Sequence, residues 1–465
     1  MQSTQQLSPQ DAVFLSMETP DLPSHIGGLA FLECTEGPEA FALRFVDFIR
    51  ERLPVCERFS WKLQEVPFGL DRPYWVEQKD FDVADHIQRV AVPAPGGTRE
   101  LSELAGLLFE RPLDRDRPLW EMFLIEGLSG GRCALLWKVH HCLMDGASGA
   151  SLTEQLFDIS PDATRPSESA VTDSATAGKP VAPLRIVENA LRNASDLPRN
   201  QARYLEGSLR RFFGARGEES KESRVAPRVL FNGRVGKRRR VAWSSVSLDE
   251  VKKIKNALSV TVNDVILAMT SGALRTYLAD RDALPEETLI ASVPSSTRKP
   301  GDNSLGNQVR DLAIPWATNL ADPIERLLQI HEDANRAKAG AAADESISMM
   351  GVMADALLPG ALGLMMRGAA AASDRIPLPV NAVVSNVPMA PIPLYCAGAR
   401  LTQLVPISLL GATQGLNITV VSYCGELHFG LVHDPDLLPE AWALAEQIPK
   451  NFQLLQSAVD RQLES

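Results

Sequence analysis

The sequence predicts an α/β protein of two domains, and three observations predict it. The chain has 465 residues, more than a single hydrophobic core usually holds. Apolar runs of strand length are mixed along it with segments of helical spacing. From residue 160 to residue 180 it is rich in Ser, Thr, Pro and Ala without periodicity, as expected of a flexible linker. We therefore expect a first domain at 1–158, a linker at 159–240 and a second domain at 241–465.

Composition narrows the class of protein. Hydrophobic residues make up 45% of the chain and charged residues 23%, which is typical of a globular protein. The formal net charge of −11 argues against a general nucleic-acid binder. The six cysteines form no Cys-x-x-Cys pair, and the first residues have no basic and apolar signal sequence. We expect a protein of the reducing cytoplasm.

In the first domain, a helix is expected around residues 102–108 and a buried strand at 133–139. His140 and His141 follow that strand directly. Neighbouring side chains on a strand point to opposite faces, so one imidazole can face a cavity while the other packs inside. Because histidine accepts and returns protons near neutral pH, this pair is the candidate catalytic centre.

Asp145 and Gly146 follow the pair at the spacing of a tight turn, where the carboxylate could hold local backbone or pair with an arginine. Metal binding is not favoured, since no Cys or Glu stands at ligand spacing around these histidines. Cys142 is a weaker candidate nucleophile, because its side chain diverges from that of His141. The remaining histidines stand alone and are interpreted as structural: His25, His86, His331, His428 and His433.

The segment 185–240 contains 15 Lys/Arg against 6 Asp/Glu, a local net charge of +9 in an acidic protein. One interpretation is a solvated helical connector that pairs with the acidic domains. The other is attraction to anionic lipid headgroups or to the phosphates of a nucleotide-containing substrate. Phe212 and Phe213 beside Arg210 and Arg211 would suit an interfacial anchor.

The second domain begins near Val241. Capping boxes at 247–250 and 261–264 predict two helix starts, and a strand is expected at 289–293. The apolar tract 351–373 is interrupted by charges and a proline, so we expect a buried or channel-lining helix rather than a membrane span. Strands at 416–423 and 427–432 form a predicted hairpin, and a helix is expected at 437–463.

Several segments together resemble the bacterial wax ester synthase/diacylglycerol acyltransferase family. The motif His140-His141-x-x-x-Asp145-Gly146 is similar to the active-site motif of the CoA-dependent acyltransferase superfamily. The resemblance covers the chain from near residue 7 to beyond Asp434, and Met389 departs from it where a glycine is expected. The other segments that carry it are Leu7–Leu15, His25–Leu29, Pro118-Leu119-Trp120, Asn263-Asp264 and Ser385-Asn386-Val387-Pro388.

The resemblance implies two chloramphenicol acetyltransferase-like domains, with mixed sheets flanked by helices, joined by a long linker. Only the first retains the histidine pair. It implies transfer of a fatty acyl group from acyl-CoA to a long-chain alcohol or to diacylglycerol. Acyl-CoA is then a co-substrate and no cofactor or metal is needed. Lipid substrates also raise the expectation of peripheral association with a membrane or lipid droplet.

On this resemblance His141 is the general base, and Asn263 is the candidate donor to the oxyanion. His140 is expected to orient the strand end, and Asp145 to pair with an arginine, with Arg298 as the candidate. The remaining motif residues are expected at the substrate site, although capping or packing alone would also explain them: Gly146, Pro118, Leu119, Trp120, Asp264, Ser385 and Asn386.

Two other functions stay open. One is a polyketide-associated acyltransferase or condensation enzyme of the same superfamily, which uses carrier-bound thioesters. The other is a non-catalytic lipid-droplet protein that binds lipid through the basic segment and the apolar tracts. Turnover of free acyl-CoA without a carrier protein would separate the first from a wax ester synthase. Lipid binding without turnover would identify the second.

Overall fold

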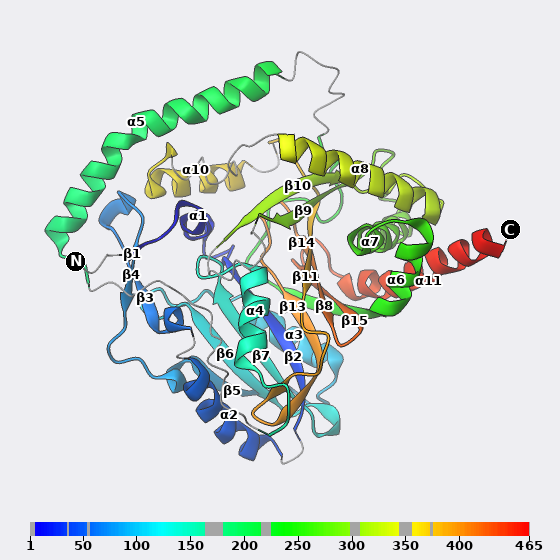
Figure 1. The fold of residues 1–465 in the computed structure, drawn as a ribbon, viewed down its shortest axis with the longest axis horizontal. Coiled ribbons are helices and arrows are strands. Elements are labelled where there is room, and N and C mark those ends of the chain that lie inside the picture. The colour runs from blue at the N-terminus through cyan, green and yellow to red at the C-terminus, as the bar shows by residue number, and fades with distance from the viewer. Residues whose placement is uncertain are drawn as a thin grey trace.

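The computed structural model describes residues 5–34, 37–53, 56–162, 180–214, 225–297, 307–343, 356–372 and 375–464. Two six-stranded mixed sheets form its centre, each flanked by helices (Figure 1). A three-stranded sheet of β1 (Gln5–Gln6), β4 (Tyr74–Glu77) and β3 (Trp61–Gln64) lies beside the first of them. The predicted α/β architecture with two sheet-centred halves is confirmed.

The first sheet has the strand order β12-β13-β2-β7-β6-β5, in which β5 and β6 are parallel and the other pairs antiparallel. A helix near residue 102 and a strand from residue 133 are confirmed. The strands are β2 (His25–Glu33), β5 (Ile87–Ala91), β6 (Trp120–Glu126), β7 (Cys133–His140), β12 (Tyr395–Cys396) and β13 (Ala399–Ile407). The helices of this half are α1 (Pro9–Met17), α2 (Pro38–Arg52), α3 (Thr98–Phe109) and α4 (Gly146–Leu156).

The second sheet has the order β10-β9-β11-β14-β15-β8. The hairpin of β14 and β15, the capping box of α7 and the C-terminal helix are present as predicted, whereas at α6 only the Ser247 side chain caps the helix, because the Glu250 carboxylate contacts Lys253 and Gln456. Its strands are β8 (Arg240–Ser247), β9 (Ile290–Ser296), β10 (Val309–Pro315), β11 (Ala382–Pro388), β14 (Leu416–Tyr423) and β15 (Glu426–His433). Its helices are α6 (Leu248–Leu258), α7 (Val262–Ala279), α8 (Pro323–Ala343), α10 (Pro359–Ala371) and α11 (Ala441–Glu464).

The division at residue 241 does not hold for β12 and β13, which the chain order places in the second domain. β13 pairs antiparallel with β2 of the first sheet, from Arg400 opposite Glu33 to Ile407 opposite Gly27. This pairing satisfies the main-chain hydrogen-bonding groups that β2 would otherwise expose at a sheet edge. The two halves are therefore joined by shared strands as well as by packing.

Buried side chains from both sheets form a common core between the halves. Phe31 and Phe123 of the first sheet belong to one cluster with Trp243 and Val432 of the second. Helix α3 packs so closely here that a Cβ at Gly106 would lie 2.3 Å from the Arg239 carbonyl oxygen. The halves are thus fixed relative to each other beside the strand that carries the histidines.

The first part of the basic segment forms a helix, α5 (Pro183–Gly214), at the edge of the molecule (Figure 1), and residues 225–239 are not helical. Residues 163–179 of the expected flexible linker, and residues 215–224, lie outside the described part. Arg239 is buried, so the basic run at 237–240 is partly structural. Its guanidinium donates to the carbonyls of Gly236, Arg238 and Asp21.

Helix α10 does not bear out the expectation of a buried apolar helix. Leu362 is buried, but Leu364 is 68% exposed and Met365 is 43% exposed. One face of α10 packs on α1 and the opposite face has no cover among the described residues, because the helix lies outside both sheet cores. In the described ranges no single helix is long and apolar enough to cross a membrane, and α6 with α7 reaches that length only across a 105° bend.

Candidate active site

The adjacent histidines lie where β7 ends and the chain turns towards α4. The His140 amide donates to the Leu119 carbonyl at 2.9 Å, and the His141 amide donates to the Ser24 carbonyl at 2.8 Å. The Leu143 amide donates back to the His140 carbonyl at 3.0 Å, which closes a tight turn. These bonds fix the main chain of both histidines.

The imidazole of His141 is stacked on Phe14 of α1, with ring centroids 4.0 Å apart and 9° between the ring planes. Its Nδ1 is buried and has no hydrogen-bond partner in the described ranges. Burial lowers the pKa of His141 from 6.5 to about 4, although its own main-chain carbonyl and Asp145 act in the opposite direction. The ring is therefore neutral near pH 7, as a general base must be.

The imidazole of His140 is fully buried, and both of its ring nitrogens lie next to polar groups. The Cys142 amide donates to its Nδ1 at 3.1 Å, so the proton of the neutral ring is on Nε2. That Nε2 lies 3.5 Å from Oε1 of Glu18, whose other oxygen accepts from Arg115 at 2.7 Å. Burial acts to raise the pKa of Glu18, but His140 and Arg115 outweigh it and lower the pKa to about 2. His140 is thus held by a charged pair.

Asp145 is the N-cap of α4. Its Oδ1 accepts from the amide and the hydroxyl of Ser148, both at 2.8 Å, which satisfies a free amide of the first helical turn. Its Oδ2 accepts from the Gln308 amide at 3.2 Å. The carboxylate therefore joins α4 to the segment before β10. The proposed partner Arg298 lies outside the described residues.

Pro118, Leu119 and Trp120 lead into β6, next to β7. The Leu119 carbonyl accepts the His140 amide, and Trp120 lies opposite Val139. The Trp120 indole nitrogen donates to the Phe59 carbonyl at 2.8 Å, and its ring is stacked on His86. The segment holds the histidine strand by buried packing, and it contacts the turn through the main chain.

Ser385 and Asn386 lie on β11, whose end reaches α4. Both are half-buried and pair in parallel with Thr419 and Val420 of β14. The next residue of β11, Val387, lies against Gly146 at the start of α4. A Cβ added to Gly146 would lie 3.2 Å from Cγ2 of Val387. The structure therefore brings the Ser385-Asn386 strand beside the histidine motif.

Asn263 and Asp264 are not brought to the histidines by any contact of the described residues. They lie in the first turn of α7, where Asp264 and Thr261 form the capping box. Oδ2 of Asp264 also lies 2.7 Å from Nδ1 of His331 on α8. Helix α7 packs with α8 and α11 in the second core, and the oxyanion role of Asn263 stays a prediction.

The sequence interpretation missed four residues of this site. Phe14 and Glu18 belong to α1 and the turn after it, and contact the two rings. Asp11 on the same helix accepts from the Asn307 side chain at 2.8 Å, and that side chain donates to the His141 carbonyl at 2.7 Å. The spacing Ser8-x-x-Asp11 was an available signal for a helix start, since Ser8 caps α1.

The remaining chemical candidates from the sequence are the cysteine beside His141, the other histidines and a metal site. Burial raises the pKa of the Cys142 thiol well above its usual value, which disfavours a thiolate nucleophile. In the part of the chain that the structure describes, no group of His, Cys, Asp and Glu is arranged to hold a metal. Of the lone histidines, His86 contacts the Trp120 carbonyl, His428 contacts the Ser245 hydroxyl and His25 contacts the Phe109 carbonyl.

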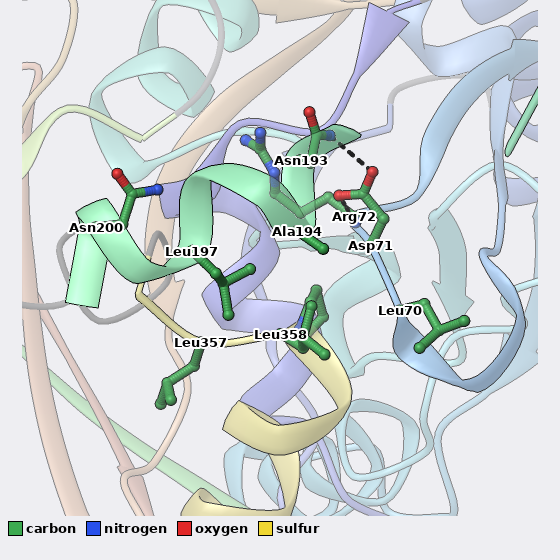
Figure 2. Close-up of a pocket in the computed structure, with 10 residues that line it drawn as sticks. Leu70, Asp71, Arg72, Asn193, Ala194, Leu197, Asn200, Leu357 and Leu358 are labelled. Carbon is green, nitrogen blue, oxygen red and sulfur yellow. Dashed lines mark hydrogen bonds between the residues drawn. The ribbon is translucent and has the colours of Figure 1, made fainter. Parts of the chain in front are cut away.

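Two pockets are lined in part by Pro359, at the start of α10. One of about 190 Å³ is lined by Ala12, Leu15 and Ser16 of that helix and by Glu18 and Arg115. A second, of about 140 Å³, lies between α5 and the start of α10. Figure 2 shows the leucines of both segments around the second pocket, with Asn193 bonded to Asp71 at its rim. Since Phe14 faces His141, α1 separates the first pocket from the base.

A mixed α/β fold in two halves, with adjacent histidines at a strand end where the halves meet, defines an acyltransferase of the chloramphenicol acetyltransferase-like class. Residues 7–266 match the family model of the wax ester synthase/diacylglycerol acyltransferase catalytic domain, and residues 305–456 match that of its C-terminal domain. The chain belongs to the wax ester synthase/diacylglycerol acyltransferase family.

Individual proteins similar to this chain support its membership of the family. A putative diacylglycerol O-acyltransferase of Mycobacterium tuberculosis is 34% identical, over 99% of this chain and 92% of its own length. The O-acyltransferase WSD of Acinetobacter baylyi is 32% identical, over 98% of both chains. The solved wax ester synthase/diacylglycerol acyltransferase of Marinobacter aquaeolei is similar with a TM-score of 0.71 and 29% identity, over 98% of this chain and 100% of that one. A condensation domain of the CDA synthetase, 17% identical with a TM-score of 0.57 over 98% of this chain and 96% of that one, shares the fold.

Proposed function

We propose that this O-acyltransferase moves a fatty acyl group from acyl-CoA to a long-chain alcohol or to diacylglycerol, with His141 as general base. The observation that carries the proposal is the buried, neutral imidazole of His141 at the junction of the two halves. The names of the relatives supply the acceptor classes, alcohol and diacylglycerol.

The reaction needs two proton transfers, one from the acceptor hydroxyl to His141 and one from His141 to the CoA thiolate. The acceptor hydroxyl is too weakly acidic to ionise near pH 7, so Nε2 of His141 takes its proton while the oxygen attacks the thioester carbonyl carbon. The C–O bond forms, the tetrahedral intermediate collapses, and the C–S bond breaks. The CoA thiolate then takes the proton from the imidazolium. No acyl-enzyme forms, which agrees with the suppressed acidity of Cys142.

His140 and Asp145 then have positioning roles. His140 is held by Glu18 and by the Cys142 amide, and it fixes the turn that aims His141. Asp145 starts α4, and its two oxygens accept from Ser148 and from the Gln308 amide, so we assign it to the helix cap and to the junction with the segment before β10. Base catalysis contributes roughly 10²–10⁴-fold, and holding both substrates in place supplies the rest.

The test is product formation from palmitoyl-CoA with hexadecanol or with a diacylglycerol, in the absence of any carrier protein. The proposal predicts alcohol- or diacylglycerol-dependent CoA release, with wax ester or triacylglycerol as the product. Turnover only with a carrier-bound thioester would favour the condensation-type alternative. Lipid binding without turnover would favour the non-catalytic alternative.

Peripheral association with a lipid surface is the second part of the proposal. Helix α5 has two apolar faces: Ile186 and Ala190 are buried, whereas Leu184 and Leu191 are 72% and 68% exposed. Phe68, at the loop beside α10, is 94% exposed. A helix with an uncovered apolar face and arginines along it is suited to an anionic bilayer surface. Among the α5 side chains whose burial the structure describes, the exposed arginines are Arg185, Arg192 and Arg199.

Flotation with vesicles tests this second part. Wild type should float with phosphatidylcholine vesicles that contain phosphatidylglycerol, and Leu184→Gln/Leu191→Gln should float less. Leu43→Gln is the matched control, because Leu43 is 74% exposed on α2. Equal flotation of the α5 variant and wild type would remove α5 from the lipid contact.

A further inference from the structure

Asn307 reaches from the second half of the molecule to the histidine motif of the first. It lies two residues before β10, and its Nδ2 donates to the His141 carbonyl at 2.7 Å and to Oδ1 of Asp11 at 2.8 Å. Its main-chain amide donates to the same Asp11 oxygen at 3.1 Å. An amide nitrogen has two hydrogens, so both donors of this side chain are used.

The acceptor of the same side chain is unused. Asn307 and Asp11 are each 5% exposed, and Oδ1 of Asn307 is buried with no hydrogen-bond partner in the described ranges. Nδ1 of His141, on the residue that Asn307 already contacts, is also buried and unpaired. Unsatisfied buried polar atoms cost about 1–3 kcal/mol each. Oδ1 of Asn307 accepts a hydrogen bond and Nδ1 of His141 can carry a hydrogen, so the two unpaired atoms could satisfy each other.

The electrostatics agree with a contact between these groups. Burial is the dominant influence on the pKa of His141 and lowers it; the residue's own main-chain carbonyl, Asp145 and then the Asn307 side chain act in the opposite direction. A group that favours the protonated ring interacts with the imidazolium better than with the neutral imidazole. The imidazolium is the state that His141 passes through when it holds the acceptor's proton.

We propose that Asn307 is the positioning residue of His141: it holds the His141 carbonyl through Nδ2 and faces Nδ1 with Oδ1, so that Nε2 is the basic nitrogen. The inference rests on the proposed function for its role in the reaction. In the neutral ring the proton is on Nδ1, towards Oδ1. After Nε2 takes the proton of the acceptor hydroxyl, Oδ1 stabilises the Nδ1–H of the cation. Asp11 fixes the amide in this orientation.

The competing explanation is a clamp between the halves that never contacts the ring. The double variant Asp11→Asn/Asn307→Asp separates the two, because it exchanges donor and acceptor between positions 11 and 307 and places a carboxylate beside Nδ1, although it gives up the donor to the His141 carbonyl. Positioning through Nδ1 predicts that the acid limb of kcat/KM moves upwards from about pH 4 towards 6.5. A clamp predicts that the acid limb stays where it is.

Two measurements on the full-length protein distinguish a positioning role of Asn307 from a clamp between the halves. The first is the ¹⁵N spectrum of histidine-labelled protein, assigned with His141→Gln, which reports the tautomer without any turnover. We expect His141 to be in the Nδ1–H form in wild type and in a mixture of tautomers in Asn307→Ala. The second is steady-state kinetics, where Asn307→Ala should lower kcat about 10- to 100-fold and change KM by less than about twofold.

Asn451→Ala is the matched control, because Asn451 is a buried asparagine of α11 that bonds to Gln447 and Thr276. It should lose stability without changing the tautomer or the acid limb. An unchanged tautomer and kcat in Asn307→Ala, or an unmoved acid limb in the double variant, would overturn the inference. Absence of turnover in wild type would instead overturn the proposed function, and the tautomer measurement would still decide the role of Asn307.

Discussion

The ring of His141 lies flat on the ring of Phe14, with 4.0 Å between their centroids. Phe14 belongs to α1, and the same helix carries Asp11 and ends next to Glu18, which contacts His140. One short helix near the start of the chain and the residue that follows it therefore contact both histidines of the motif. Its position sets the burial of His141 and, through burial, the pKa of the proposed base.

Removing the Phe14 ring should move the pH dependence of the enzyme. Burial depresses the pKa of His141 to about 4, so wild-type kcat/KM should stay level down to about pH 5. In Phe14→Ala water reaches the ring, and the acid limb should rise towards the pKa of about 6.5 of a solvated histidine. The measurement is kcat/KM against pH, with an uncharged pantetheine thioester as donor so that CoA does not titrate.

Phe45→Ala provides the control for lost packing, since Phe45 is fully buried in the same core. It should destabilise the protein and leave the acid limb in place. An acid limb near pH 6.5 in wild type, or no shift in Phe14→Ala, would contradict the link between burial and basicity.

The Glu18 carboxylate should make stability depend on pH in acid. Its pKa is about 2 in the folded protein and 4.5 in the unfolded chain, so its contribution is fully present above pH 4.5 and is lost as the pH falls towards 2. Glu18→Gln should remove on the order of 2 kcal/mol at neutral pH and flatten this acid slope. Urea unfolding at a series of pH values measures both. A parallel slope in Glu18→Gln would refute the assignment.

Loss of the Asp145 carboxylate should affect both the helix and the junction of the halves. Asp145→Ala removes the cap of α4, which costs about 1 kcal/mol, and leaves the Gln308 amide without this acceptor. Thr261→Ala removes an equivalent cap at α7, away from the histidines. Thermal unfolding should show a loss in both variants, but kcat should fall in Asp145→Ala alone. Equal kcat in the two variants would contradict a role for Asp145 at the site.

Gly106 tests the seating of α3 between the halves. Gly106→Ala would place a Cβ 2.3 Å from the Arg239 carbonyl oxygen, so the helix must shift and stability should fall by more than about 1 kcal/mol. In Gly368→Ala the new Cβ has open space on α10, and the gain in helix propensity should be about 0.5–1 kcal/mol. The two changes should shift the melting temperature in opposite directions, and a shift in the same direction would argue against close packing at Gly106.

Local signals in the sequence predicted much of this architecture. The apolar run before His140 defines β7, and the N-cap residues Ser247 and Thr261 begin α6 and α7. The hairpin of β14 and β15 follows from two apolar strands around Cys424-Gly425, both of which have positive φ. In each case the residues that determine the element are close together in the chain.

Long-range partners could not be predicted in this way. β13 pairs with β2 across more than 360 residues of chain, and neither strand carries a signal that names its partner. Asn307 meets Asp11 and His141 through the same assembly, so its role depends on tertiary structure alone. Asp264 forms the capping box that its spacing from Thr261 predicts, whereas the oxyanion role of Asn263, which came from the family resemblance, stays a prediction.

The most direct test of the account is palmitoyl-CoA-dependent ester formation by wild type and His141→Gln, which preserves a polar side chain of similar size. Phe14, Asp11 and Asn307 surround that residue, so the variant's fold should first be verified by its melting temperature. The account predicts alcohol-dependent CoA release in wild type and a loss of about 10²-fold or more in folded His141→Gln. Undiminished ester synthesis by the folded variant would show that His141 is not the base.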